Sequence, residues 1–385
     1  MDAAVSYLPK DWVQVAVADA ADVDPENLGA STNPSFEFNY VSLENCSHGR
    51  LEGFARHSFA TAPSRARRII HQGDFLYATV RPNLRGHHFF EIEGGVWIAS
   101  TGFAVVRARP AICSPAYLAA LLSSDLIQRQ VDVLLTGSNY PAISSRDVRA
   151  LKIALPPLPE QIAISSALSD ASALVESLDA LIAKKRNMLR GVRAQLLSGA
   201  IRLIGFGGPW QEDSFANRLI NKSANGSLIK GRQSSAPLPG LFPGFSASGQ
   251  DVWCEEAEFS GDGLVVSAVG SRCGKVFRAT GAWTAIANTH VLLGVEGRVD
   301  VRYAWHILND EEFWVKGGTG QPFVLMKESL KKVTTWPAVE EQTAIADVLD
   351  DLGNEIDALV LERDKAELIR QGMAQDLLSG KVRLV

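Results

Sequence analysis

A run of basic side chains between residues 56 and 88 is the first place in this sequence where residue type and spacing suggest chemistry. Acids are nearly absent from it, Asp74 being the exception, and Tyr77 is among the aromatic residues interleaved with the cations. Arginine can bond guanine bidentately in the major groove, and arginine or lysine can neutralise phosphates. The run indicates DNA contact, with a solvated charged face as the alternative. Its candidate contact residues are Arg56, Arg65, Arg67, Arg68, Arg81, Arg85 and His87.

The second half of the chain offers fewer cationic candidates. They are Lys222, Lys230, Arg232, Arg272 and Lys275. Two polar turns, residues 137–140 and 318–321, each precede a proline. These turns add Asn139, Tyr140 and Gln321 as candidates for reading loops, although a hairpin or a helix entry would have the same composition.

Motifs that would indicate an enzyme are incomplete. Residues 33–36 resemble the Asn-Pro-Pro-Tyr/Phe loop of adenine methyltransferases but depart at Ser35, and no glycine-rich cofactor turn accompanies them. Residues 270–275 resemble a phosphate-binding loop, but Val269 stands where its first glycine should be and no Ser or Thr follows Lys275. The histidines lack metal spacing, and no nucleophile elbow is present. We therefore predict no catalytic residue, no metal and no cofactor.

Composition is that of an ordinary globular protein. The 385 residues are 46% hydrophobic and 21% charged, which predicts two or three domains. No signal peptide and no membrane-length apolar run is visible. Four scattered cysteines indicate reduced thiols in a cytoplasmic protein. The net charge of −5 argues against DNA binding, but the acids are concentrated near the C-terminus, so a domain elsewhere can still present a basic face.

Mixed strand and helix patterns must position these candidates. Residues 12–17, 36–43 and 96–106 read as strands, and residues 68–80 as strand, turn and strand. Residues 117–133 have helical spacing. The sequence thus predicts an α/β or α+β domain over residues 1–155.

An apolar repeat dominates the rest of the organisation. The stretch 156–203 recurs at 337–384 without a gap, so that Glu160-Gln161 falls on Glu341-Gln342 and Arg202 on Arg383, 181 positions apart. Both copies carry apolar residues at steps of three and four, which predicts two long helices with a coiled-coil seam. The predicted seam consists of Ile164, Leu168, Val175, Leu178, Ile182, Ile345, Leu349, Leu352, Ile356 and Leu359. The simplest packing partner for each helix is the other copy in the same chain. Two separate amphipathic helices, each packed on its own domain, are the alternative.

The duplication extends to the regions between the helices. Residues 98–101 (IAST) correspond to 286–289 (IANT), and Tyr117 corresponds to Tyr303. We predict four segments: a first domain over 1–155, a long helix within 156–203, a second domain over 204–336 and a second long helix within 337–385. Antiparallel pairing of the helices would relate the two halves by a pseudo-two-fold axis.

This arrangement resembles the DNA-sequence specificity subunit of Type I restriction-modification enzymes over the full chain. The specific part of the resemblance is the pair of helix motifs, PPLPEQ with LLSGAIRL and EEQ with LLSGKVRL. The second copy departs from the pattern where Ala338-Val339-Glu340 replaces Pro157-Leu158-Pro159.

The resemblance implies a non-catalytic subunit in which two target-recognition domains are separated by antiparallel helices. Each domain would read one half of a split, asymmetric site in double-stranded DNA. The implied partners are modification (methyltransferase) subunits, two in number, and restriction subunits, with no membrane. Two alternatives are a self-contained DNA methyltransferase with built-in recognition domains and a coiled-coil scaffold without a DNA role.

Overall fold

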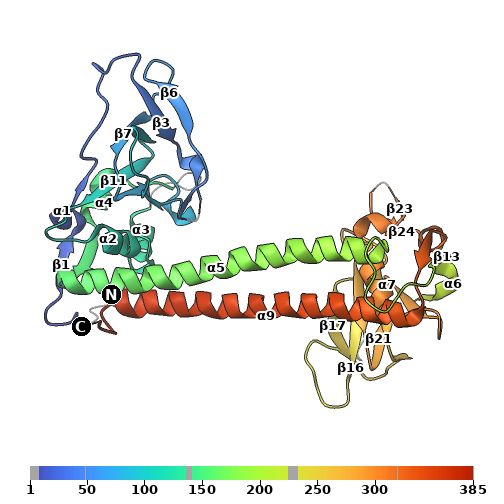
Figure 1. The fold of residues 1–385 in the computed structure, drawn as a ribbon. Coiled ribbons are helices and arrows are strands. Elements are labelled where there is room, and N and C mark those ends of the chain that lie inside the picture. Colours follow the sequence, from blue (N-terminus) through green and yellow to red (C-terminus); the bar gives the residue numbers. More distant parts are fainter. Residues whose placement is uncertain (1–7, 48, 136–140, 224–232, 319, 385) are drawn as a thin grey trace. The chain divides into compact units, whose positions relative to one another are not determined.

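The computed structural model describes residues 8–47, 49–135, 141–223, 233–318 and 320–384. The chain forms two compact units: unit 1 contains residues 1–179 and 361–385, and unit 2 contains residues 180–360. Each unit includes one half of each of two long helices, α5 (Leu158–Leu197) and α9 (Val339–Leu378) (Figure 1).

Two four-stranded sheets form most of the β structure in the described part of unit 1. The first has the order β6-β3-β10-β7, with β3 and β10 parallel, and consists of β3 (Glu37–Val41), β6 (Ala55–Ser58), β7 (Ala66–Ile70) and β10 (Trp97–Ser100). The second is antiparallel in the order β2-β11-β8-β9, with β2 (Ala21–Val23), β8 (Asp74–Ala78), β9 (His88–Phe89) and β11 (Phe103–Ala108). Shorter pairs are β1 (Val13–Ala16) with β12 (Lys152–Leu155), and β4 (Cys46–Ser47) with β5 (Arg50–Leu51).

The second sheet of unit 1 is buried on both faces, which explains its apolar strands. Alternate residues of β8 face opposite ways: Phe75 and Tyr77 join the core that contains the helices, whereas Leu76 and Ala78 join the core against the first sheet. The short helices of this unit are α1 (Val17–Ala20), η1 (Leu43–Asn45), η2 (Pro82–Leu84), α2 (Pro115–Leu122), α3 (Asp125–Leu134) and α4 (Ser145–Ala150).

Unit 2 repeats this plan. Within its described residues, the sheet β14-β22-β19-β20 consists of β14 (Leu219–Ser223), β19 (Gly263–Ser267), β20 (Val276–Ala279) and β22 (Thr289–Gly294). The sheet β15-β17-β16-β21-β18 consists of β15 (Gln233–Ser234), β16 (Phe242–Ser246), β17 (Gly249–Cys254), β18 (Phe259–Ser260) and β21 (Ala282–Ala285). Shorter pairs are β13 (Gln211–Ser214) with β25 (Val333–Trp336), and β23 (Lys316–Gly317) with β24 (Phe323–Val324). Its short helices are α6 (Phe215–Arg218), α7 (Val301–Leu308), η3 (Glu311–Phe313) and α8 (Met326–Leu330).

The strand pairings confirm the predicted α+β class and the tandem repeat. In unit 1, β3 pairs with β10 in parallel and with β6 antiparallel; in unit 2, β16 pairs with β21 in parallel and with β17 antiparallel. Likewise, the β1–β12 pair precedes α5 and the β13–β25 pair precedes α9. The main difference is β15, which lies beyond β17 in unit 2.

One strand prediction needs correction. The predicted strand at 96–106 is two strands, β10 and β11, which belong to different sheets. Gly102 lies between these two strands, where the chain passes from one sheet to the other. A Cβ atom at this position would lie only 2.5 Å from Leu43 Cδ1, so the close packing requires glycine. The strand, turn and strand predicted within 68–80 are confirmed as β7 and β8, which belong to different sheets.

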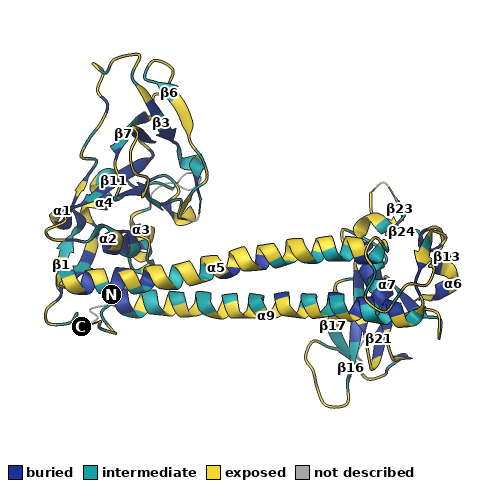
Figure 2. Ribbon diagram, in the orientation of Figure 1, coloured by how far each residue is buried: buried dark blue, intermediate teal, exposed yellow. Residues whose placement is uncertain are grey.

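The long helices pack against each other antiparallel within each unit. In unit 1, Ile164 and Leu168 near the start of α5 share a core with Leu377 and Leu378 at the end of α9. In unit 2, Leu196 at the end of α5 shares a core with the first turns of α9. Buried positions recur along both helices (Figure 2). Of the predicted seam, Val175, Leu352 and Leu359 are half-buried and these seven are buried: Ile164, Leu168, Leu178, Ile182, Ile345, Leu349 and Ile356.

The repeated glutamine fastens the start of each long helix to its own unit. The side-chain oxygen of Gln161 accepts from the backbone N–H of Ser114 (2.8 Å), and its amide nitrogen donates to the carbonyls of Ile112 and Pro156. Gln342 makes the equivalent contacts with the N–H of Asp300 (3.0 Å) and the carbonyls of Arg298 and Pro337. Ser114 and Asp300 are the N-caps of α2 and α7, so each glutamine joins a long helix to a short one.

The repeated glutamate is held in a clasp of one arginine and one tryptophan. Glu160 is 1% exposed and accepts from Arg383 Nε (2.6 Å) and Trp12 Nε1 (3.1 Å). Glu341 in unit 2 accepts in the same way from Arg202 Nε (2.5 Å) and Trp210 Nε1 (3.2 Å). Each glutamate, at the start of one long helix, therefore fixes the segment that follows the other long helix.

Gly199 and Gly380 lie two residues beyond the ends of α5 and α9, with φ of 70° and 74°. This left-handed conformation after a helix favours glycine, which explains why both copies of the repeat carry a glycine there. The four cysteines are buried and free. Among the described residues, no helix combines the length and the hydropathy that a membrane crossing requires.

Candidate nucleic-acid interface

A cationic turn (residues 79–85) connects β8 to β9 in unit 1. Arg81 and Arg85 flank η2, and both have positive φ, 50° and 51°. Positive φ is costly for residues other than glycine, and such strain is concentrated at functional sites. Both side chains are exposed, and Arg85 forms an ion pair with Asp125 of α3.

The cationic turn of unit 1 is hydrogen-bonded to residues 141–143, the segment that follows the predicted polar turn in sequence. The N–H of Arg81 donates to the carbonyl of Pro141 (2.8 Å), and the N–H of Ile143 donates to the carbonyl of Thr79 (2.9 Å). Asn139 and Tyr140, the predicted contact residues of that turn, lie outside the described residues.

Unit 2 has a matching pair of turns. The N–H of Gly270 donates to the carbonyl of Pro322 (2.8 Å), and the N–H of Val324 donates to the carbonyl of Ala268 (2.9 Å). The second cationic turn (residues 268–275) carries Arg272 and Lys275, both exposed, and Gln321 is exposed beside it. The fold therefore brings these three candidates together, at the place equivalent to the Arg81 turn of unit 1.

His87 is a correction to the predicted contact set. It is 4% exposed, its ring stacks on Tyr77 with centroids 4.0 Å apart, and its Nδ1 accepts from the N–H of Ala78. Burial lowers the pKa of His87 to about 4, so the ring is neutral at physiological pH. A buried neutral imidazole cannot neutralise a phosphate, and we omit His87 from the candidate surface.

The other arginines of the run lie on or near β6 and β7, and they differ in how far their side chains are buried or bound by other residues of the protein. Arg68 is half-buried, with ion pairing to Asp24 (3.0 Å) and a hydrogen bond to Asn27 Oδ1 (2.9 Å). Arg67 lies over the ring of Phe59, 4.8 Å from its centroid. Arg56 and Arg65 are exposed. The run is thus not one continuous basic face.

The remaining unit 2 candidates are dispersed. Lys222 is exposed on β14, with its Nζ 5.9 Å from the ring centroid of Phe259. Lys230 and Arg232 lie outside the described residues. Nothing described joins Lys222 to the second cationic turn.

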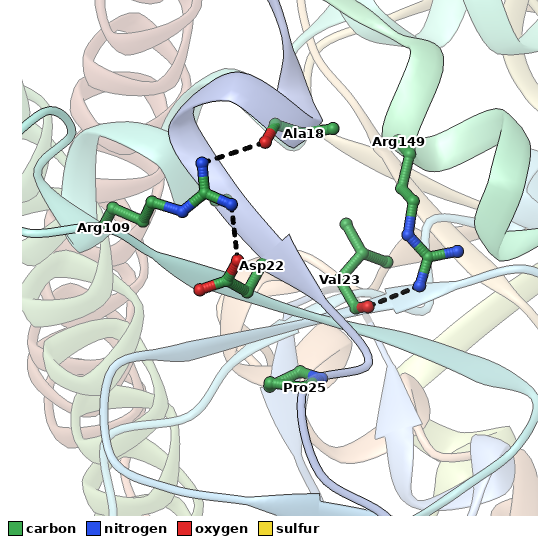
Figure 3. A pocket seen from close by; sticks show the side chains of 7 residues that line it. Ala18, Asp22, Val23, Pro25, Arg109 and Arg149 are labelled. Carbon is green, nitrogen blue, oxygen red and sulfur yellow. Dashed lines mark hydrogen bonds and ion pairs between the residues drawn. The ribbon is translucent and has the colours of Figure 1, made fainter.

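A separate hollow in unit 1 involves two arginines that the sequence reading did not select. Arg109 donates to the carbonyl of Ala18 (3.1 Å) and to Asp22 Oδ1 (2.6 Å), and Arg149 donates to the carbonyl of Val23 (2.6 Å) (Figure 3). Because both guanidinium groups are engaged by the protein itself, this hollow is a structural junction of α1, β2 and α4.

Glu37 and Asn39 were missed by the sequence reading. They line a surface hollow together with Arg56 and Ser58, on the outer face of β3 and β6. The available signal was the alternation of residues 36–41 (FEFNYV), which places positions 37 and 39 on one face and apolar positions on the other.

Within the described residues, no group of three or more His, Cys, Asp or Glu side chains could hold a metal ion. Among the exposed candidates, Arg56, Arg81 and Arg272 carry guanidinium groups, Lys275 an ammonium group and Gln321 an amide. Such groups suit hydrogen bonding to base edges and phosphates.

Residues 60–184 match the family model described as the Type I restriction modification DNA specificity domain. None of the curated proteins compared matches this chain in sequence. Among solved structures, the HsdS subunit from Thermoanaerobacter tengcongensis is similar, with a TM-score of 0.56 and 22% identity over 99% of this chain and 100% of that one.

Two further structures are similar over nearly their whole length. One is the S subunit of a Type I restriction-modification system from M. genitalium, with a TM-score of 0.64 and 13% identity over 98% of each chain. The other comes from a structure of the assembly of a type I R-M system, with a TM-score of 0.60 and 22% identity over 97% of this chain and 99% of that one. Residues 60–184 are therefore similar to the Type I restriction modification DNA specificity domain, and the whole chain has the fold of the specificity subunits whose structures it resembles.

Proposed function

We propose that this chain is the DNA sequence-recognition subunit of a Type I restriction-modification complex, and that each unit reads one half of a bipartite, asymmetric target. The observation that carries the proposal is the repeated fold with unlike surfaces. The same pair of turns carries Arg81 and Arg85 in unit 1 but Arg272, Lys275 and Gln321 in unit 2. Two recognition domains that share a fold but present different side chains recognise two different half-sites.

The proposed division of labour follows the segments expected from the sequence. Residues 1–155 and 204–336 form the target-recognition domains, and the helices within 156–203 and 337–385 form a spacer between them. Antiparallel packing of the helix halves within each unit supports this division. Half-sites on one face of B-DNA that are separated by one helical turn lie about 34 Å apart. A helix of 40 residues, as α5 and α9 are, is roughly 60 Å long, so the spacer can bridge this distance.

Two modification (methyltransferase) subunits dock on this chain in the proposal, and restriction subunits join them in the cytoplasm. The partners supply the S-adenosylmethionine and ATP chemistry, and this chain supplies the choice of sequence. The exposed acidic residues of α9 are the proposed docking surface, among them Glu340, Asp351 and Glu355.

Selection of bound duplexes from a random-sequence library by the purified full chain tests the proposal. The expected product is two short conserved blocks separated by a gap of fixed length and free sequence. Binding weakens as salt rises, because phosphate contacts release counterions. Enrichment of no sequence, or of one continuous block, contradicts the bipartite reading.

The same purified chain distinguishes this function from that of a self-contained methyltransferase. Under the proposal it does not bind S-adenosylmethionine in calorimetry at a ligand concentration that saturates known methyltransferases. Measurable binding would favour the enzyme instead.

A further inference from the structure

β3 and β6 are the two outermost strands at one edge of the four-stranded first sheet of unit 1, and this outer pair has one polar and one apolar face. In this antiparallel pair, Glu37 lies opposite Ser58, and Asn39 lies opposite Arg56. Residues opposite each other point to the same face. These four residues define the β3–β6 face. The alternate residues Phe38 and Tyr40 are buried on the other side.

The β3–β6 face is hollowed. Its four residues line a hollow of about 490 Å³ together with Phe38, His57, Thr61 and Val96. The hydroxyls of Ser58 and Thr61 lie 3.1 Å apart and close one side of it. A concave polar surface on an edge ribbon is accessible to a macromolecule, because no further described strand pairs beyond β6.

Three groups of the β3–β6 face are not engaged by the protein. Among the described residues, no hydrogen bond or ion pair involves the side chains of Glu37, Asn39 or Arg56. Other arginines of unit 1 are tied to carboxylates, as Arg107 is to Asp74 (2.8 Å) and Arg109 to Asp22 (2.6 Å). An acceptor, an amide and a cationic donor that share one hollow without partners suit an external hydrogen-bonding ligand.

The chemistry of these three groups matches the major-groove edges of DNA bases. An arginine bonds guanine O6 and N7, an asparagine bonds adenine N6 and N7, and a carboxylate accepts from cytosine N4. The major groove is about 12 Å wide and admits a two-stranded β-ribbon. Residues two apart on a strand are separated by about 6.7 Å, close to the length of two base-pair steps. Glu37 and Asn39 therefore have the spacing to meet base pairs that are two steps apart.

We propose that the β3–β6 face is the base-reading surface of unit 1, inserted into the major groove with Arg56 on a guanine, Asn39 on an adenine and Glu37 on a cytosine. Arg65, exposed in the loop after β6, contacts a phosphate and positions the ribbon. This assignment rests on the proposed function and names specificity residues within it.

The test compares library selections by the full chain and by its Arg56→Ala and Asn39→Ala variants. Arg56→Ala loses the guanine preference at one position of one block, with discrimination falling roughly 5- to 150-fold. Asn39→Ala loses an adenine preference in the same block. The other block keeps its sequence in both variants, because unit 2 is untouched.

The matched control is Arg129→Ala, which removes an exposed arginine of α3 in the same unit. It leaves the consensus unchanged, and thermal unfolding confirms that all three variants are folded. A wild-type consensus that survives both Arg56→Ala and Asn39→Ala overturns the base-reading assignment alone. A wild-type chain that enriches no sequence overturns the proposed function, and this assignment with it.

Discussion

At the scale of single residues, the basic run between 56 and 88 separates into side chains with different roles. Arg68 pairs with Asp24, His87 lies in the core against Tyr77, and Arg56 faces a hollow without a partner in the described structure. Residue type alone does not distinguish these roles, because an arginine or histidine can serve packing, structural pairing or recognition. Burial and partners decide among them.

His87 provides a prediction on pH. Its pKa in the folded protein is about 4, below the ordinary 6.5, because burial disfavours the charged ring. Between these values the unfolded chain binds the proton and the folded chain does not, so stability is fully present above pH 6.5 and falls as the pH falls towards 4. From pH 7 to pH 5 we expect a loss of about 2 kcal/mol in the free energy of unfolding from this residue.

Urea unfolding of the wild type and of His87→Asn at pH 7 and pH 5 measures this effect. The variant is less stable overall but loses less stability between the two pH values. His306 is also buried, with its pKa lowered by burial to about 4, and it contributes equally in both proteins. Identical pH dependence of the unfolding free energy in wild type and variant would show that His87 is not the source of the stability loss.

At the scale of elements, the long helices are joined to their units by repeated polar contacts as well as by the apolar seam. Glu160 and Gln161 act together: the glutamate holds Arg383 and Trp12, and the glutamine holds the N-cap of α2. Because Glu341 and Gln342 do the same in unit 2, the Glu-Gln motif at each helix start is a structural attachment. Its repetition is explained without a role in DNA reading.

We expect Glu160→Gln to destabilise the protein by about 2 kcal/mol, because the neutral amide cannot form two charge-assisted bonds with Arg383. The comparison residue is Glu176 on the same helix, whose ion pair with Arg50 is exposed on both sides. Glu176→Gln changes stability by less than about 0.5 kcal/mol. Urea unfolding at pH 7 measures both, and equal effects of the two substitutions would refute a structural role for the clasp.

At the scale of the whole molecule, the two long helices connect two units of like fold. The ion pairs Asp179–Arg363 in unit 1 and Lys185–Glu355 in unit 2 define an antiparallel register, in which residue numbers rise along α5 as they fall along α9. If the helices are the spacer of the proposed function, helix length sets the gap between half-sites.

Deleting residues 177–183 and 358–364 together tests this spacer. The pair is matched in the observed register and removes seven residues from each helix, or about 10 Å of length. We expect the gap in the selected DNA to shorten by about three base pairs, at about 3.4 Å per pair, while the two conserved blocks keep their sequences. Deletion of 177–183 alone breaks the register and is the control for misfolding. An unchanged gap in the matched deletion would exclude the helices as the ruler.

The sequence by itself determined the α+β class, the tandem repeat and the two long helices. These features are encoded locally: apolar spacing of three and four fixes a helix face, and a repeat at a constant offset of 181 positions needs no tertiary information. The glycines that end the helices, Gly199 and Gly380, were also readable, because a left-handed residue after a helix has a strong residue preference.

Only the tertiary structure decided which polar residues are available for recognition. Glu37 and Asn39 look ordinary in sequence, and they share a face with Arg56 because β3 pairs with β6 in one register. Gly102 and Gly73 lie where the chain passes between sheets, so strands adjacent in sequence do not pair but contribute side chains to one shared core, as Ile70 and Leu76 do. Contacts between distant segments set burial and pairing, and local sequence does not record them.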